Sequence, residues 1–201
     1  MNISPRRSAV APSGRPRGIP GANAVHHVAY TVPDLDQAVR FFTEALGAEL
    51  LYVQGPVEDP TGDWMTRKLG VAADARAHVA MLRLGAVTNL ELFEYTAPDQ
   101  RRQIPRNSDW GGHHLAIHVE DVDLAAAYLR SWPGVHVLGE PETITDGPIA
   151  GDRWVYFLTP WGMQMELINL PVGIPYEQQV RARLYRPDQP WNNEGPVAHN
   201  G

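Results

Sequence analysis

Apolar and polar positions follow the same order of patterns twice along the chain. In each half an apolar run rich in strand-forming residues comes first, and apolar positions at helical spacing follow it. Three further strand-like runs then complete each half. These later runs cover, in the first half and then in the second, residues 48–54, 76–84, 88–95, 135–139, 153–159 and 163–170. Both halves therefore predict the order strand, helix, strand, strand, strand.

An aspartate stands where each predicted helix begins. The first strands of the two halves end at Val32 and Val119, and Asp34 and Asp121 come two residues later. An aspartate at this position is typical of an N-cap, because its side chain accepts hydrogen bonds from the free backbone N–H groups of the first turn. Gly47 is placed to end the first helix.

The two halves also share residues, so the pattern is an internal repeat. "HHVAYTVPDLDQAVRFF" at 26–42 aligns with "HHLAIHVEDVDLAAAYL" at 113–129, and seven of the 17 positions are identical. The identical residues include both histidines and both aspartates of each segment. More weakly, "LEL" at 90–92 corresponds to "MEL" at 165–167. The sequence therefore predicts two copies of one module.

The boundaries of these modules follow from composition. We expect a flexible leader, a first module, a linker, a second module and a C-terminal arm, over residues 1–23, 24–96, 97–112, 113–170 and 171–201. The leader carries four arginines, four prolines and no acid, so a transit peptide is the alternative to a flexible segment. We also expect one extra helix within 58–75 and a short helix within 176–185.

Composition excludes several classes of protein. The 201-residue chain has 43% hydrophobic and 20% charged residues, as soluble globular proteins do. Its net charge of −6 disfavours nucleic acid and anionic membrane partners. With no cysteine, the chain has no disulfide, thiolate zinc site or cysteine nucleophile. No apolar run reaches the roughly 18 residues of a membrane span. We therefore expect a cytoplasmic protein.

Glutamates between apolar neighbours mark the last strand of each module. Glu91 or Glu166 alone would ordinarily face solvent, and a single strand histidine ordinarily makes a hydrogen bond in the core or at the surface. The repeat favours a different interpretation, in which one histidine and one glutamate from each module form a set of four. Two imidazoles and two carboxylates suit Zn, Ni, Co, Mn or Fe(II), and the ion would neutralise the glutamates.

The segments that carry these residues resemble one known superfamily. "HHVAYTVPDLDQAVRFFTEALG", "LELFEY", "HHLAIHVEDVD" and "TPWGMQMELI" are similar to the vicinal oxygen chelate superfamily, which includes glyoxalase I, methylmalonyl-CoA epimerase and extradiol dioxygenases. The resemblance implies an α+β fold in which two βαβββ modules form a half-open mixed β-barrel. It also implies that His27, Glu91, His114 and Glu166 are the metal ligands.

Strand alternation supports the choice between adjacent histidines. His27 shares a strand face with the small residues Ala29 and Thr31, whereas His26 shares the other face with bulky residues suited to packing under a helix. By the same alternation His114 faces the cavity and His113 faces away.

A metal with four side-chain ligands favours proton transfer next to a carbonyl group. The resemblance to glyoxalase I implies that Glu91 and Glu166 are the catalytic base and acid. We therefore predict a metal-dependent epimerase or isomerase that acts through a metal-stabilised enediolate. The alternatives are a glyoxalase I-type lyase, an extradiol-type dioxygenase and a non-catalytic binding or resistance protein.

The expected substrate is a small oxygenated carbonyl compound, either a keto-sugar or keto-cyclitol or an acyl thioester. The candidate substrate contacts share the predicted cavity-facing side of their strands. They are Thr31, Phe93, His118, Trp154, Tyr156 and Gln164. By analogy with the superfamily we expect a homodimer, in which the barrel closes either within one chain or across two chains.

Overall fold

The computed structural model describes residues 18–180 and residue 184, and its strands form two open, mixed sheets. In the first sheet the strand order is β1-β4-β3-β2, with bounds Val28–Thr31 (β1), Glu49–Val57 (β2), Arg76–Leu84 (β3) and Thr88–Thr96 (β4). In the second it is β5-β9-β8-β6, with β7 paired to β8. Its bounds are Leu115–His118 (β5), His136–Val137 (β6), Glu142–Thr143 (β7), Arg153–Leu158 (β8) and Gln164–Asn169 (β9). The predicted α+β fold is confirmed.

Both sheets have the same topology, as the repeat predicts. The first and last strands of each set are parallel neighbours: β1 lies beside β4, and β5 lies beside β9. The intervening strands pair antiparallel to the last strand and to one another. This arrangement places the start of each first strand beside the first half of each last strand.

Capping aspartates begin both module helices, as the sequence predicts. Helix α1 spans Leu35–Arg40 and continues as the π-helical turn η1 (Phe41–Ala45), and helix α2 spans Val122–Arg130. The Asp34 carboxylate accepts a hydrogen bond from the Gln37 amide at 2.8 Å, and Asp121 accepts one from Leu124 at 2.9 Å. Each side chain satisfies one otherwise free donor of the first turn.

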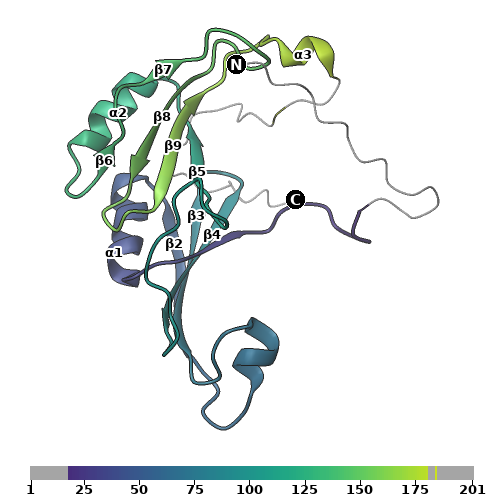
Figure 1. Ribbon diagram of the computed structural model, residues 1–201, viewed down its shortest axis with the longest axis vertical. Coiled ribbons are helices and arrows are strands. Elements are labelled where there is room, and N and C mark those ends of the chain that lie inside the picture. Colours follow the sequence, from purple (N-terminus) through teal and green to yellow (C-terminus); the bar gives the residue numbers. More distant parts are fainter. Residues whose placement is uncertain (1–17, 181–183, 185–201) are drawn as a thin grey trace, which may run out of the picture.

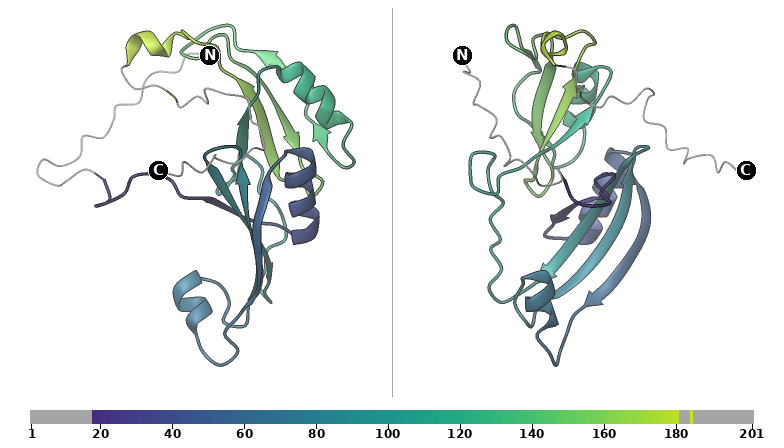
Figure 2. Two further views of the ribbon diagram at one scale, coloured as in Figure 1. Left: turned by 180° about the vertical axis from the view of Figure 1, so that it is seen from behind. Right: turned by 90° about the vertical axis from the view of Figure 1, so that its right-hand side faces the viewer.

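One hydrophobic core joins the two modules. The two helices lie side by side on the same side of the sheets (Figures 1 and 2). Buried residues of both helices and both sheets belong to a single cluster. Trp161, in the turn before β9, packs against Phe41 with ring centroids 5.5 Å apart, and the Tyr128 hydroxyl donates to the Ala45 carbonyl oxygen at 3.2 Å. The modules therefore share apolar contacts rather than merely a linker.

Some predicted elements are shorter in the structure. The strand expected at 135–139 is reduced to β6, because Gly139 has a left-handed backbone (φ 80°) and Pro141 lacks an N–H group. The extra helix expected within 58–75 is only η2 (Met65–Leu69), which ends at Gly70 (φ 69°). It lies at the end of the first sheet farthest from the second module (Figure 2).

The helix expected within 176–185 is α3 (Tyr176–Gln179), which ends where Val180 becomes extended. Residues 181–183 and 185–201 of the arm, and 1–17 of the leader, lie outside the described residues. Within the described part, no helix is both long and apolar enough to cross a bilayer.

Candidate metal and substrate site

The first module holds one imidazole beside one carboxylate. His27 directly precedes β1, and Glu91 lies in the middle of β4, opposite Ala29. Because β1 and β4 are parallel neighbours, the His27 and Glu91 side chains meet on the face of the sheet that points away from α1. The His27 Nε2 atom lies 3.3 Å from a Glu91 carboxylate oxygen, and the His27 side chain is 38% exposed.

The second module repeats this arrangement. His114 directly precedes β5, and Glu166 lies in β9 opposite Ala116. The His114 Nε2 atom lies 3.0 Å from a Glu166 oxygen, and only 11% of the Glu166 side chain is exposed. Each module therefore presents one imidazole nitrogen and one carboxylate oxygen at the same place, both of a type that binds divalent metals.

The neighbouring histidines take other positions. The His113 ring stacks on Tyr30 with ring centroids 5.0 Å apart, and its Nδ1 atom lies 2.9 Å from the Gly111 carbonyl oxygen. The Nδ1 atoms of His26 and His27 lie 2.9 Å apart. In the second module, strand alternation therefore directs one histidine toward the glutamate and the other toward the first module.

Electrostatics favour a positive charge at the second pair. Burial raises the pKa of Glu166, His114 opposes this rise, and the charge of Asp152 adds to it. Burial also raises the pKa of Tyr156, and the charge of Glu166 raises it further. A cation bound beside His114 would stabilise the glutamate anion and offset its desolvation.

Four of the candidate substrate contacts lie on the same face of the second sheet as the second pair. We call this side of the second sheet its inner face, defined by His114, Glu166, Tyr156 and Trp154. The Tyr156 ring lies 5.1 Å from the His114 ring and 5.1 Å from the Trp154 ring, between centroids. By strand alternation the inner face continues through the candidates His118, opposite Ile168, and Gln164, opposite Leu158.

The other two candidates lie in the first sheet. Thr31 and Phe93 are register partners in β1 and β4, on the same face as Glu91. The Phe93 ring stacks on Tyr95 with centroids 5.3 Å apart. Burial raises the pKa of Tyr95, and the charge of Glu91 adds to this rise. This half of the candidate site is therefore largely aromatic.

The structure does not bring the four predicted ligands together. Among the described residues, no three histidine, cysteine, aspartate or glutamate side chains are grouped as a metal site requires. The His27–Glu91 pair belongs to the first sheet and the His114–Glu166 pair to the second. A single chain therefore presents two half-sites, each with two of the four predicted ligands.

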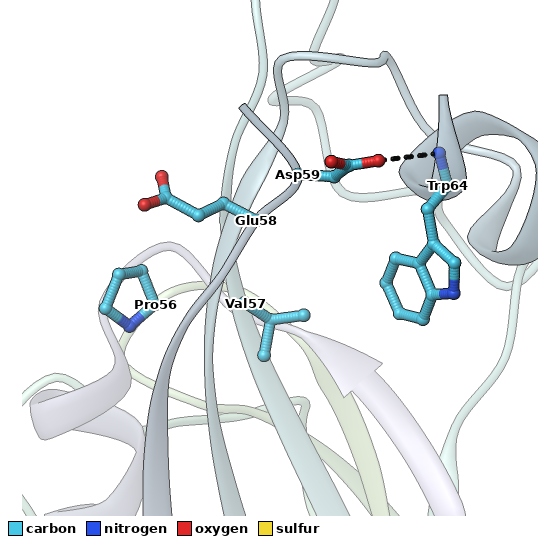
Figure 3. Close-up of a pocket in the computed structure, with 5 residues that line it drawn as sticks. All are labelled: Pro56, Val57, Glu58, Asp59 and Trp64. Atoms are coloured by element: carbon cyan, nitrogen blue, oxygen red, sulfur yellow. Dashed lines mark hydrogen bonds between the residues drawn. The ribbon is translucent and has the colours of Figure 1, made fainter. Parts of the chain in front are cut away.

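A separate hollow of about 490 Å³ lies at the extra segment, away from both pairs. Pro56, Val57, Glu58, Asp59 and Trp64 line it (Figure 3). The Trp64 amide donates to the Asp59 carboxylate at 3.0 Å, and Glu58 forms an ion pair with Arg76. None of the predicted site residues contributes to this hollow.

Asp152 is the residue of the inner face that the sequence did not single out. It directly precedes β8, two residues before Trp154 and four before Tyr156, and it is only 2% exposed. Asp152, Trp154 and Tyr156 are spaced two residues apart, which places them on one face of a strand. This spacing is a sequence signal that could have identified Asp152. A lone aspartate at a strand end nevertheless resembles an ordinary loop residue.

Comparisons with known proteins show to which family the chain is related. Residues 26–157 match the model of the glyoxalase/bleomycin resistance protein/dioxygenase superfamily. The chain is 76% identical over 177 residues to a 2-epi-5-epi-valiolone epimerase from Actinomyces sp., covering 88% of this chain and 96% of the relative.

Two solved structures show the same fold. A glyoxalase family protein from Bacillus cereus superposes with a TM-score of 0.57 at 21% identity, over 76% of this chain and 99% of its own. The trypanothione-dependent glyoxalase I of Leishmania major gives a TM-score of 0.50 at 24% identity, over 79% of this chain and 91% of its own.

Proposed function

The chain belongs to the glyoxalase/bleomycin resistance protein/dioxygenase superfamily, and we propose that it is an epimerase of a cyclic polyhydroxy ketone, of the 2-epi-5-epi-valiolone class. The observation that carries this proposal is the repeated pairing of an imidazole nitrogen with a carboxylate oxygen, at 3.3 Å in one module and 3.0 Å in the other. The 76% identity to the Actinomyces epimerase supports the substrate class.

The donor set fits a divalent metal ion. His27, Glu91, His114 and Glu166 would hold it, and their two negative charges would balance a divalent cation. Such a cation supplies Lewis acidity: it draws electron density from the ketone oxygen and so acidifies the adjacent C–H bond. The donor atoms alone do not select among Zn, Ni, Co, Mn and Fe.

Epimerisation requires a proton to leave one face of a carbon and return to the other. One glutamate removes the proton from the carbon next to the ketone, and the electron pair of the broken C–H bond moves toward the carbonyl oxygen. Return of a proton to the opposite face restores the ketone with inverted configuration. Glu91 and Glu166 come from different sheets, so they suit attack on opposite faces. Tyr156 and Trp154 provide a wall against which the ring lies.

A complete site needs both kinds of half-site, and we propose that two copies of the chain supply them. The first-sheet pair of one copy would meet the second-sheet pair of another, so a homodimer would hold two four-ligand sites. Strand β2 supports an association of this kind, because Leu50, Leu51, Tyr52 and Val53 of this edge strand are each 44–54% exposed.

The first experiment measures proton exchange and metal content together. Incubation with 2-epi-5-epi-valiolone in deuterium oxide should give an epimerised ketone with deuterium at the carbon next to the carbonyl. Glu91→Gln and Glu166→Gln should each lower kcat by roughly 10²- to 10⁴-fold and reduce the bound metal. Glu44→Gln, an exposed change on η1, should alter neither property.

Other outcomes would identify other functions. Oxygen consumption with a catechol and Fe(II) would instead indicate a dioxygenase, and thioester formation from a hemithioacetal would indicate a glyoxalase. Tight binding of the ketone without turnover or metal would indicate a binding protein. Full metal content and unchanged activity in both glutamine variants would refute the proposed ligand and base roles.

A further inference from the structure

Asp152 is a buried acid, and one of its two carboxylate oxygens lacks a hydrogen-bond partner among the described residues. The residue is 2% exposed, and its Oδ1 atom is buried with no hydrogen-bond partner in the described part of the chain. Burial raises the pKa of this carboxyl group. An unpaired buried carboxyl group costs free energy, and such groups in native proteins commonly have a functional reason.

The adjacent arginine does not compensate it. Arg153 points to the helix side, where its guanidinium contacts Asp123 of α2 at 2.6 Å and the Thr143 hydroxyl at 3.0 Å. Strand alternation places Asp152 on the opposite side, with Trp154 and Tyr156. Arg153 is therefore adjacent to Asp152 in sequence, but its positive charge lies on the other face of the sheet.

The carboxyl group lies on the same face of the second sheet as the His114–Glu166 pair. Tyr156 is the register partner of Glu166, and Asp152 precedes Tyr156 by four residues, about 13 Å of backbone. The two carboxyl groups are close enough for the charge of Asp152 to act on Glu166. The aromatic rings of Tyr156 and Trp154 occupy the interval between these two acids.

We propose that Asp152 is a specificity-determining residue, whose carboxyl group accepts a hydrogen bond from a ring hydroxyl of the polyhydroxy ketone while the ketone oxygen lies at the His114–Glu166 pair. This inference rests on the proposed function and adds a recognition site to it. A carboxyl oxygen without a protein partner suits a neutral hydroxyl donor, and the flanking rings suit the C–H face of a cyclitol.

Loop 144–151 leads directly into Asp152 and holds its backbone in place. The loop closes at Asp152, whose carbonyl oxygen accepts from the Ile144 amide at 2.8 Å and whose amide donates to Ile149 at 3.0 Å. These hydrogen bonds fix the Asp152 backbone. The Asp152 side chain is covered in the structure, so the hydrogen bond to a substrate hydroxyl would require side chains around it to shift.

The test compares Asp152→Asn with Asp146→Asn, an exposed change in the same loop. Calorimetry gives the Kd of metal-loaded protein for 2-epi-5-epi-valiolone and for analogues that each lack one hydroxyl. We expect Asp152→Asn to weaken binding of the full ketone roughly 10- to 100-fold, with unchanged metal content, and Asp146→Asn to have no effect. The original protein should bind one deoxy analogue more weakly than the full ketone by a similar factor. Asp152→Asn should bind that analogue and the full ketone with nearly the same affinity.

The outcomes separate the two proposals. If no deoxy analogue shows this non-additivity, or if Asp152→Asn binds the full ketone as tightly as the original protein, Asp152 does not recognise the substrate. Binding without turnover would refute the proposed reaction, while the affinities would still decide the role of Asp152. If the original protein neither binds nor converts the ketone, both proposals are wrong. The analogue series still tests the inference if Asp152→Asn does not fold. If the original protein binds every deoxy analogue as tightly as the full ketone, no hydroxyl is recognised and the inference is wrong.

Discussion

Burial of Asp152 has a consequence for stability as well as for recognition. Its pKa is raised in the folded protein, so between its ordinary pKa and the raised value the folded state binds more protons than the unfolded state. In that window stability falls as pH rises. Above the window the full desolvation cost of the buried carboxylate is present, and below it this cost disappears.

We therefore expect Asp152→Asn to stabilise the metal-free protein at neutral pH. The amide carries no charge to desolvate, so the melting temperature should rise by a few degrees at pH 7. The gain should shrink as pH falls toward the ordinary pKa of aspartate, about 3.9. Melting curves of both proteins between pH 4 and pH 8 measure this, and a gain that does not depend on pH contradicts the argument.

At the residue scale, the repeat decided what the sequence could predict. His114 follows His27 by 87 residues, and Glu166 follows Glu91 by 75 residues. Because each candidate ligand in one module has a counterpart in the other, the repeat indicated all four. Asp152 has no such counterpart. In the second sheet Asp152 stands four residues before Tyr156, the partner of Glu166. The equivalent position in the first sheet is Ala77, four residues before Met81, the partner of Glu91. A search for polar residues repeated in both modules therefore misses Asp152.

At the scale of elements, capping residues determine where the module helices begin. Asp34→Ala removes the acceptor of the Gln37 amide and leaves that donor without its side-chain partner. We expect the free energy of unfolding to fall by about 0.5–2 kcal/mol. Asp36→Ala, a change in the same turn that removes no N-cap, is the matched control and should cost less. Chemical denaturation of the two variants measures the difference, and equal losses would show that charge rather than capping matters.

Strand and helix order was predictable because both depend on local periodicity, whereas element length was not. Strand β6 is short because Gly139 takes a left-handed conformation. Similarly, the fold ties α1 to β4 through the Glu94 carboxylate, which accepts from the Leu35 amide at 2.8 Å. That contact joins residues 59 positions apart, so local pattern could not indicate it.

At the scale of the whole molecule, the separation of the two half-sites predicts complementation between inactive variants. One variant carries His27→Ala with Glu91→Gln, and the other carries His114→Ala with Glu166→Gln. Each alone should be inactive. If sites form across two copies, random pairing makes half of the dimers mixed, and each mixed dimer has one intact site. Co-expression should then restore about one quarter of the original activity.

The control for this experiment is a single chain that carries all four substitutions, co-expressed with either variant. It should restore no activity, because no pairing then yields an intact site. If the two complementary variants also remain inactive together while each still forms dimers, the proposal that two copies supply one site is wrong. The sequence alone left closure within one chain and closure across two chains open, since the same four residues serve both.

The continuous core under α1 and α2 makes the two modules a single cooperative unit. Phe41 and Trp161 come from different modules and touch within that core. Neither module can lose its packing without exposing apolar surface of the other, so both should melt in one transition despite their origin as a repeat. Differential scanning calorimetry would show whether there is one transition or two. Although the sequence repeats, we therefore expect that neither half of this chain folds without the other.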